Sequence, residues 1–85
     1  MVNSVEIKEV LEKELVADEI YVYQDGKHFR VIVVSAYFVG MNRVDRQKMV
    51  YAPLTTFIVN NCIHSVSIFT YTPVEWRGIN DDDKS

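Results

Sequence analysis

Two histidines are the residues of this chain best suited to binding a metal. His28 follows Asp25 and Gly26, a pair typical of a hairpin turn, and His64 directly precedes a segment with strand-like alternation. If the segments that begin at the two histidines are neighbouring parallel strands, both imidazoles lie at the same end of one sheet. Imidazole binds zinc, copper and iron, so the pattern predicts a shared metal centre there. The alternative is two unrelated surface or half-buried side chains.

A catalytic thiol or a complete zinc site fits these residues poorly. Cys62 lies two residues before His64, but no carboxylate is close in sequence to orient the imidazole, and no oxyanion site is evident. A structural zinc ion needs four ligands, and the chain has a single cysteine. We therefore expect a non-enzymatic protein whose partner supplies the missing thiolates, because imidazole can replace thiolate on the iron of a 2Fe–2S centre. Cys62 is expected to be a small buried residue.

Length and composition indicate one small folded domain. The chain has 85 residues, of which 48% are hydrophobic and 25% charged, a mixture that excludes an intrinsically disordered protein. No segment resembles a signal peptide or a membrane span, so we expect a cytoplasmic protein without membrane contact. A mitochondrial location is the alternative if the source is eukaryotic.

The charges are distributed unevenly along the chain. Residues 1–19 hold six acids against two lysines (−4), whereas residues 27–48 hold five cations against one acid (+4). Residues 49–72 carry no formal charge. Interface cores are depleted of charged residues, so part of this neutral stretch is a candidate partner surface.

Hydrophobic periodicity and turn residues predict the elements that position the histidines. Pro53 is expected to break the long helical segment near Tyr51 and Ala52. The expected elements are a helix over 4–15, strands over 19–24 and 28–35, a loop over 36–42, two helices within 43–60, a strand over 65–71 and a terminal helical turn from Pro73.

The predicted order is α-β-β-α-α-β-α in a single small α/β (α+β) domain. A helical connection between the second and third strands is a crossover, so these two strands should pair in parallel. The result is a three-stranded mixed sheet with helices on one face. Residues 1–77 form the domain, and residues 78–85 are expected to be a flexible acidic tail.

Two segments resemble the signatures of the BolA-like proteins. The central signature corresponds to residues 38–47 (FVGMNRVDRQ) followed by Val50, Tyr51 and Leu54. The C-terminal signature corresponds to residues 63–68 (IHSVSI) and 71–76 (YTPVEW). The hairpin at residues 25–29 (DGKHF) is similar to the branch of the family with histidine in this loop. The resemblance covers residues 5–77.

The resemblance implies a fold and a function. BolA-like proteins have a fold related to the class II KH domain and pair with monothiol glutaredoxins of the Cys-Gly-Phe-Ser type. The pair can hold a glutathione-ligated 2Fe–2S cluster, in iron–sulfur trafficking, iron sensing or stress response. The implied cluster ligands are His64 and His28, and no cofactor is expected when the chain is alone, as a monomer or weak homodimer. The expected partner contacts are Ile63, Ser65, Tyr71 and Thr72.

Nucleic-acid binding is the alternative function, as a KH-like transcriptional regulator. Arg43, Arg46 and Lys48 form a short basic patch that can contact phosphate. KH domains clamp the nucleic-acid backbone with a Gly-x-x-Gly loop, whereas here Gly40 is followed three positions later by Arg43. Because the net charge is −3, we expect any DNA binding to be weak and salt-dependent. The patch is otherwise a solvated helix face.

Overall fold

The computed structural model describes the backbone of residues 2–83 and the side chains of residues 2–79. A short polar residue caps the N-terminus of each of the first two long helices. The Asn3 side chain accepts a hydrogen bond from the Glu6 amide, and the Asn42 side chain accepts one from the Asp45 amide. The helices are α1 (Ser4–Glu14), η1 (Ala36–Phe38), α2 (Arg43–Tyr51), η2 (Ala52–Leu54), α3 (Thr55–Val59) and α4 (Pro73–Asp83), and the strands are β1 (Glu19–Asp25), β2 (His28–Val34) and β3 (Ser65–Tyr71).

The sheet has the predicted topology. Its strand order is β1-β2-β3, with β1 antiparallel and β3 parallel to the central strand β2. Pro53 interrupts the helical run as expected, because α2 ends at Tyr51 and one 3₁₀ turn leads into α3. The predicted element order and the three-stranded mixed sheet are therefore confirmed.

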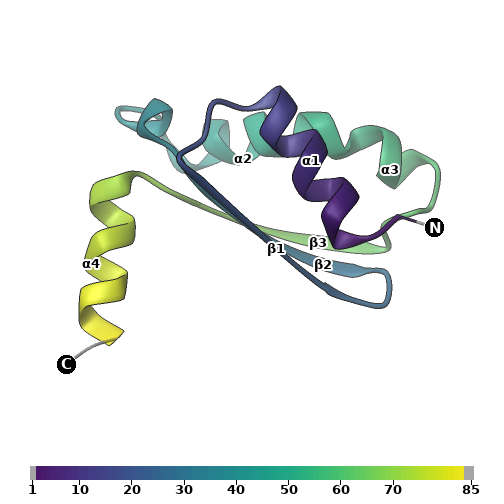
Figure 1. Cartoon of the computed structure of the whole chain (residues 1–85). Coiled ribbons are helices and arrows are strands. Elements are labelled where there is room, and N and C mark those ends of the chain that lie inside the picture. The colour runs from purple at the N-terminus through teal and green to yellow at the C-terminus, as the bar shows by residue number, and fades with distance from the viewer. Residues whose placement is uncertain (1, 84–85) are drawn as a thin grey trace.

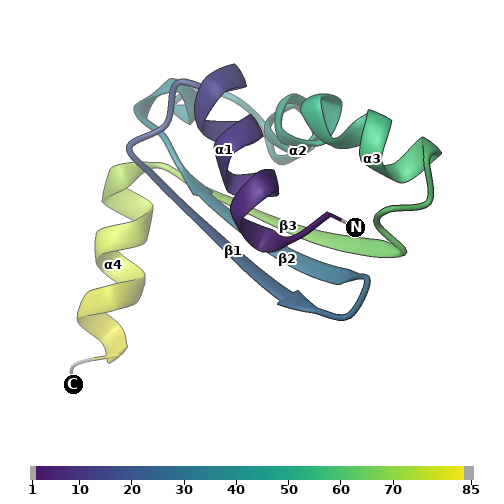
Figure 2. The same ribbon diagram turned by 45° about the vertical axis from the view of Figure 1, so that its right-hand side comes forward.

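The core lies between the sheet and the layer of α1, α2 and α3 (Figures 1 and 2). Alternate residues of β2, namely Phe29, Val31 and Val33, are buried beneath this layer. Ile7 and Leu11 of α1 are fully buried above them, four residues apart on one helix face. Burial of one face of β2 fixes its register, since a shift by one residue would expose this apolar set.

Two features differ from the expectations. The hairpin loop consists of Gly26 and Lys27, because Asp25 already pairs with His28 in the sheet. Gly26 has a φ of +61°, the positive value required of the first residue in a two-residue turn of this kind. The other difference is α4, which lies at the end of the sheet and does not join the helical layer (Figure 1). Its Trp76 packs against Tyr21 and Tyr71, which lie on the sheet face opposite the core. In residues 2–83 no helix is long and apolar enough to cross a membrane.

The terminal helix is longer than predicted. It begins at Pro73 and continues through Gly78 to Asp83, where a single turn was expected. Its first turn is held by two reciprocal hydrogen bonds between Thr72 and Glu75, which hydrophobic periodicity does not indicate. Residues 78–83 of the predicted acidic tail thus have helical backbone, and residues 84–85 lie outside the described part. The division of the chain after residue 77 stays a prediction.

A capping box starts α4 and joins it to α2. The Thr72 amide donates to a Glu75 carboxylate oxygen at 2.7 Å, and the Glu75 amide donates to the Thr72 hydroxyl at 3.2 Å. The same carboxylate oxygen of Glu75 forms an ion pair with Arg46 at 2.8 Å. The bonds from Thr72 and Arg46 hold the pKa of Glu75 below its usual value.

We expect Glu75→Gln to lower the free energy of unfolding by about 1 kcal/mol at neutral pH, a modest loss because Glu75 is partly exposed. A lowered folded-state pKa stabilises the fold above the unfolded-state value of 4.5, and this contribution is lost as pH falls through the folded pKa. The substitution should therefore flatten the pH dependence of stability in urea denaturation at acidic pH. Glu12→Gln, an exposed carboxylate of α1, is the control. Equal pH dependence in Glu75→Gln and wild type would contradict this role.

Candidate metal-binding site

Parallel pairing of β2 with β3 brings the two histidines together. His28 is the first residue of β2 and pairs with Ser65, the first residue of β3, so His64 lies one position before the strand. The two ring centroids are 5.3 Å apart, with the rings nearly perpendicular. Both side chains are exposed. The predicted meeting of the two imidazoles at one end of the sheet is thus present in the structure.

Ser65 orients the imidazole of His28. Its hydroxyl oxygen lies 2.5 Å from Nδ1 of His28. When a histidine binds a metal through Nε2, Nδ1 carries a proton and donates it to a neighbouring oxygen. Ser65 can accept this bond, which leaves Nε2 of His28 available to a metal. From the sequence, Ser65 is expected only at the partner surface, because its place opposite His28 follows from the exact register of the two strands.

The backbone before β3 holds His64 in place. The Lys27 carbonyl accepts hydrogen bonds from the amides of His64 at 2.8 Å and Ser65 at 3.3 Å. Ile63, the preceding residue, is buried in the core. The connection from α3 turns at Asn61, whose φ of 59° lies in the left-handed region that asparagine tolerates better than most residues. The hairpin and the core therefore fix the backbone of His64, while its ring faces solvent.

The spacing of the two rings fits a shared metal centre. An imidazole nitrogen binds a first-row metal at about 2.1 Å, so two rings on one tetrahedral metal have centroids about 5 Å apart. The observed separation of 5.3 Å agrees with this value. Among the side chains of residues 2–79, no group of three His, Cys, Asp or Glu residues is placed to hold a metal ion. A centre at this site would thus take its other ligands from another molecule.

Cys62 does not complete the site. It is half-buried, and its sulfur lies 3.9 Å from the carbonyl oxygen of Asn60. It packs against the edge of the core, close to its expected role as a small buried residue.

The four predicted partner contacts are divided between the two ends of β3. Ser65 is exposed beside the histidines, whereas Tyr71 ends the strand and packs on Trp76. Ile63 and Thr72 are buried, because one anchors the strand entry in the core and the other caps α4. The structure thus gives Ile63 and Thr72 internal roles, and contact with a partner stays a prediction for all four residues.

Of the three cations in the predicted basic patch, one is engaged in bonds within the protein. Arg43 and Lys48 are exposed on α2, but Arg46 bonds to Glu75 and, through Nε, to the Met41 carbonyl at 3.0 Å. Residues 40–42 connect the 3₁₀ helix η1 to α2, and Arg43, which stands where the second glycine of a Gly-x-x-Gly loop would be, begins α2. The turn between α2 and α3 spans Ala52–Leu54 and contains no glycine. The nucleic-acid hypothesis stays untested, with only two of its three cations available.

Most of the chain is similar to known proteins in sequence and in fold. A family model described as BolA-like protein matches residues 3–75. The acid stress protein IbaG of Escherichia coli (strain K12) is 51% identical over 71 residues, which cover 84% of each chain. Among solved structures, BolA1 from Arabidopsis thaliana has a TM-score of 0.74 and 34% identity, covering 88% of this chain and 98% of that one. A bolA protein homologue from Coxiella burnetii has a TM-score of 0.78 and 32% identity, covering 91% and 99%.

We expect Ser65→Ala to release the ring of His28. Without the hydroxyl, the His28 side chain should sample several rotamers, and the nuclear Overhauser effects between the rings of His28 and His64 should fall. Stability should change by less than about 0.5 kcal/mol, because Ser65 is exposed. Ser65→Thr keeps a hydroxyl and should retain the ring contacts, and Ser67→Ala is the matched control on the same face. Unchanged ring contacts in Ser65→Ala would refute this positioning role.

Proposed function

The chain belongs to the BolA-like protein family, and on this premise we propose that it is a non-enzymatic adaptor that binds a monothiol glutaredoxin and co-ligates a bridging 2Fe–2S cluster. The observation that carries the proposal is the exposed pair His28 and His64, held 5.3 Å apart by the parallel register. The histidines are the ligands, and the glutaredoxin and glutathione supply thiolates.

The ligand count supports a shared cluster. A 2Fe–2S cluster needs four protein or thiol ligands, and this chain offers two imidazoles at the site. A glutaredoxin thiolate and a glutathione thiolate would complete the set. Replacement of thiolate by imidazole raises the reduction potential of such a cluster, so the mixed complex should be easier to reduce than an all-thiolate one.

The surroundings of the histidines suit a protein partner. Both rings are exposed, so another molecule can reach them without unfolding of the chain. On the β3 side, Asn60, Asn61 and Ser65 are exposed and uncharged, whereas the hairpin side carries the exposed charges of Asp25 and Lys27. The three uncharged residues belong to the charge-free stretch 49–72, and depletion of charge is typical of interface centres. The glutaredoxin would thus cover the end of the sheet at which β2 and β3 begin.

The biological role proposed is iron–sulfur trafficking, iron sensing or stress response in the cytoplasm. The relative with 51% identity is called an acid stress protein, which supports a place among stress-response functions. In this proposal the contact of the Ser65 hydroxyl with Nδ1 of His28 positions the ring for a metal, and the protein is an adaptor and not a catalyst.

The test is to mix this chain with a cluster-loaded monothiol glutaredoxin and glutathione, and to record visible absorption and circular dichroism. We expect a new spectrum that co-elutes with both proteins on gel filtration. His64→Ala should abolish it, His28→Ala should weaken it, and Ser67→Ala should leave it unchanged. An identical spectrum in wild type and His64→Ala would refute the shared-ligand role. Absence of co-elution would refute the proposed binding of this chain to the glutaredoxin.

A further inference from the structure

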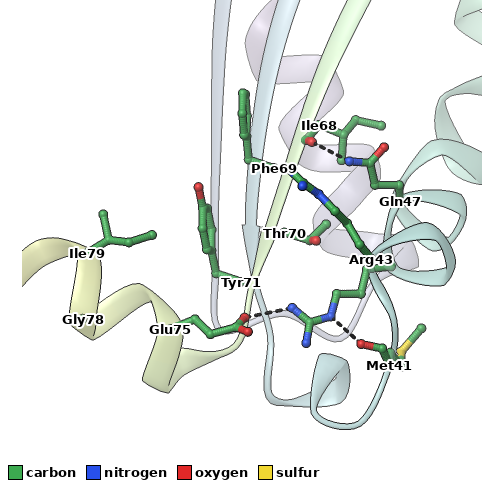
Figure 3. A pocket seen from close by; sticks show the side chains of 11 residues that line it. Met41, Arg43, Gln47, Ile68, Phe69, Thr70, Tyr71, Glu75, Gly78 and Ile79 are labelled. Atoms are coloured by element: carbon green, nitrogen blue, oxygen red, sulfur yellow. Dashed lines mark hydrogen bonds and ion pairs between the residues drawn. The ribbon is translucent and has the colours of Figure 1, made fainter.

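A groove runs along the free edge of β3, away from the histidines. Its volume is about 670 Å³, and its floor is formed by Ile68, Phe69, Thr70 and Tyr71 of β3. Figure 3 shows α2 on one side of this strand and α4 on the other. A second hollow of about 520 Å³ continues it along α2, sharing Arg43, Gln47 and Ile68 with the first.

The floor of the groove is the backbone of an edge strand. β3 pairs only with β2 in the described part of the sheet, so its other edge is unpaired. The Tyr71 carbonyl accepts from the Ser35 amide on the β2 side, whereas the Ile68 carbonyl accepts from the Gln47 side chain on the outer side. Backbone groups alternate along a strand, so Val66, Ile68 and Thr70 direct theirs toward the free edge. An open edge of this kind is a template for another strand.

The walls of the groove differ in chemistry. On the α2 side, Arg43 and Lys48 are exposed cations, while the other nearby cation, Arg46, is paired with Glu75. On the α4 side, Phe69 of β3 and Ile79 of α4 are apolar side chains with 37% and 38% exposure, and the exposed carboxylate of Glu75 is paired with Arg46. A strand added to β3 would direct alternate side chains to these two walls.

We propose that the free edge of β3 binds an extended segment of a partner protein in which acidic and apolar residues alternate, added as a fourth strand. The acidic side chains lie beside Arg43 and Lys48, and the apolar ones cover Phe69 and Ile79. Backbone hydrogen bonds to Ile68 and Thr70 provide the pairing. Gln47, now bonded to Ile68, moves aside when the segment binds.

This surface is separate from the candidate metal site. The histidines lie where β2 and β3 begin, and the groove follows the second half of β3 to α4. Ile68 is three residues beyond Ser65, about 10 Å along an extended strand. The chain can therefore hold a glutaredoxin at one end of the sheet and this segment at the other, which is the geometry of an adaptor with two protein partners.

The test uses a capped peptide of about eight residues that alternates glutamate and valine, a length typical of one strand. Binding is followed by amide chemical shifts and hydrogen exchange of the ¹⁵N-labelled full chain. We expect new protection at Ile68 and Thr70. N-methylation of the alternate peptide amides that face β3 should abolish binding, whereas N-methylation of the amides that face away from β3 should preserve it.

Charge variants give the second arm of the test. Arg43→Glu should weaken the peptide about tenfold, whereas Lys13→Glu, on exposed α1, should have no effect. Four outcomes would overturn the proposal: no protection at the β3 edge, equal binding of a lysine–valine peptide, protection that depends on the concentration of the chain alone, or stronger protection by a single-stranded oligonucleotide. The third would assign the edge to a second copy, and the fourth to nucleic acid.

Discussion

The parallel pairing of β2 with β3 is the constraint on which the candidate site depends. It places His28 opposite Ser65 and leaves His64 one residue before the strand. The register is fixed by the buried face of β2, because Phe29, Val31 and Val33 must lie under the helices. The hydrophobic core thus sets the separation of two exposed imidazoles, and the helical crossover between the strands allows both strands to begin at the same end.

A second set of contacts, among Arg46, Glu75 and Thr72, determines the shape and charge of the surface at the opposite end of β3. The pairing of Arg46 with Glu75 removes one cation from the surface and attaches α4 to α2. The two helices then flank the free edge of β3 (Figure 3), and the exposed cations Arg43 and Lys48 lie on the α2 side. The same ion pair therefore leaves fewer free cations for binding phosphate. It also holds α4 beside α2, and the groove between them exposes the edge of β3 to which an extended segment could pair.

Much of the fold was predictable because local signals and topology rules agreed. The sheet order that brings His28 near His64 is predicted by three signals together: the turn pair Asp25-Gly26, the helix break at Pro53 and the helical crossover. The contacts that were missed depend on register or on tertiary packing. Ser65 lies opposite His28 only because of the pairing between strands, and the burial of Ile63 follows from the packing of the α3–β3 connection. The Thr72-x-x-Glu75 pattern was a local signal for the start of α4 that periodicity alone does not detect.

The most direct test of the account is pulsed electron paramagnetic resonance of the reduced cluster in the mixed glutaredoxin complex, with ¹⁵N-histidine incorporated in this chain only. Shared ligation predicts strong ¹⁵N couplings that are lost in His64→Ala and retained in Ser67→Ala. A cluster in the wild-type complex without coupling to labelled histidine would contradict the central claim, because all of its ligands would then come from the glutaredoxin and glutathione.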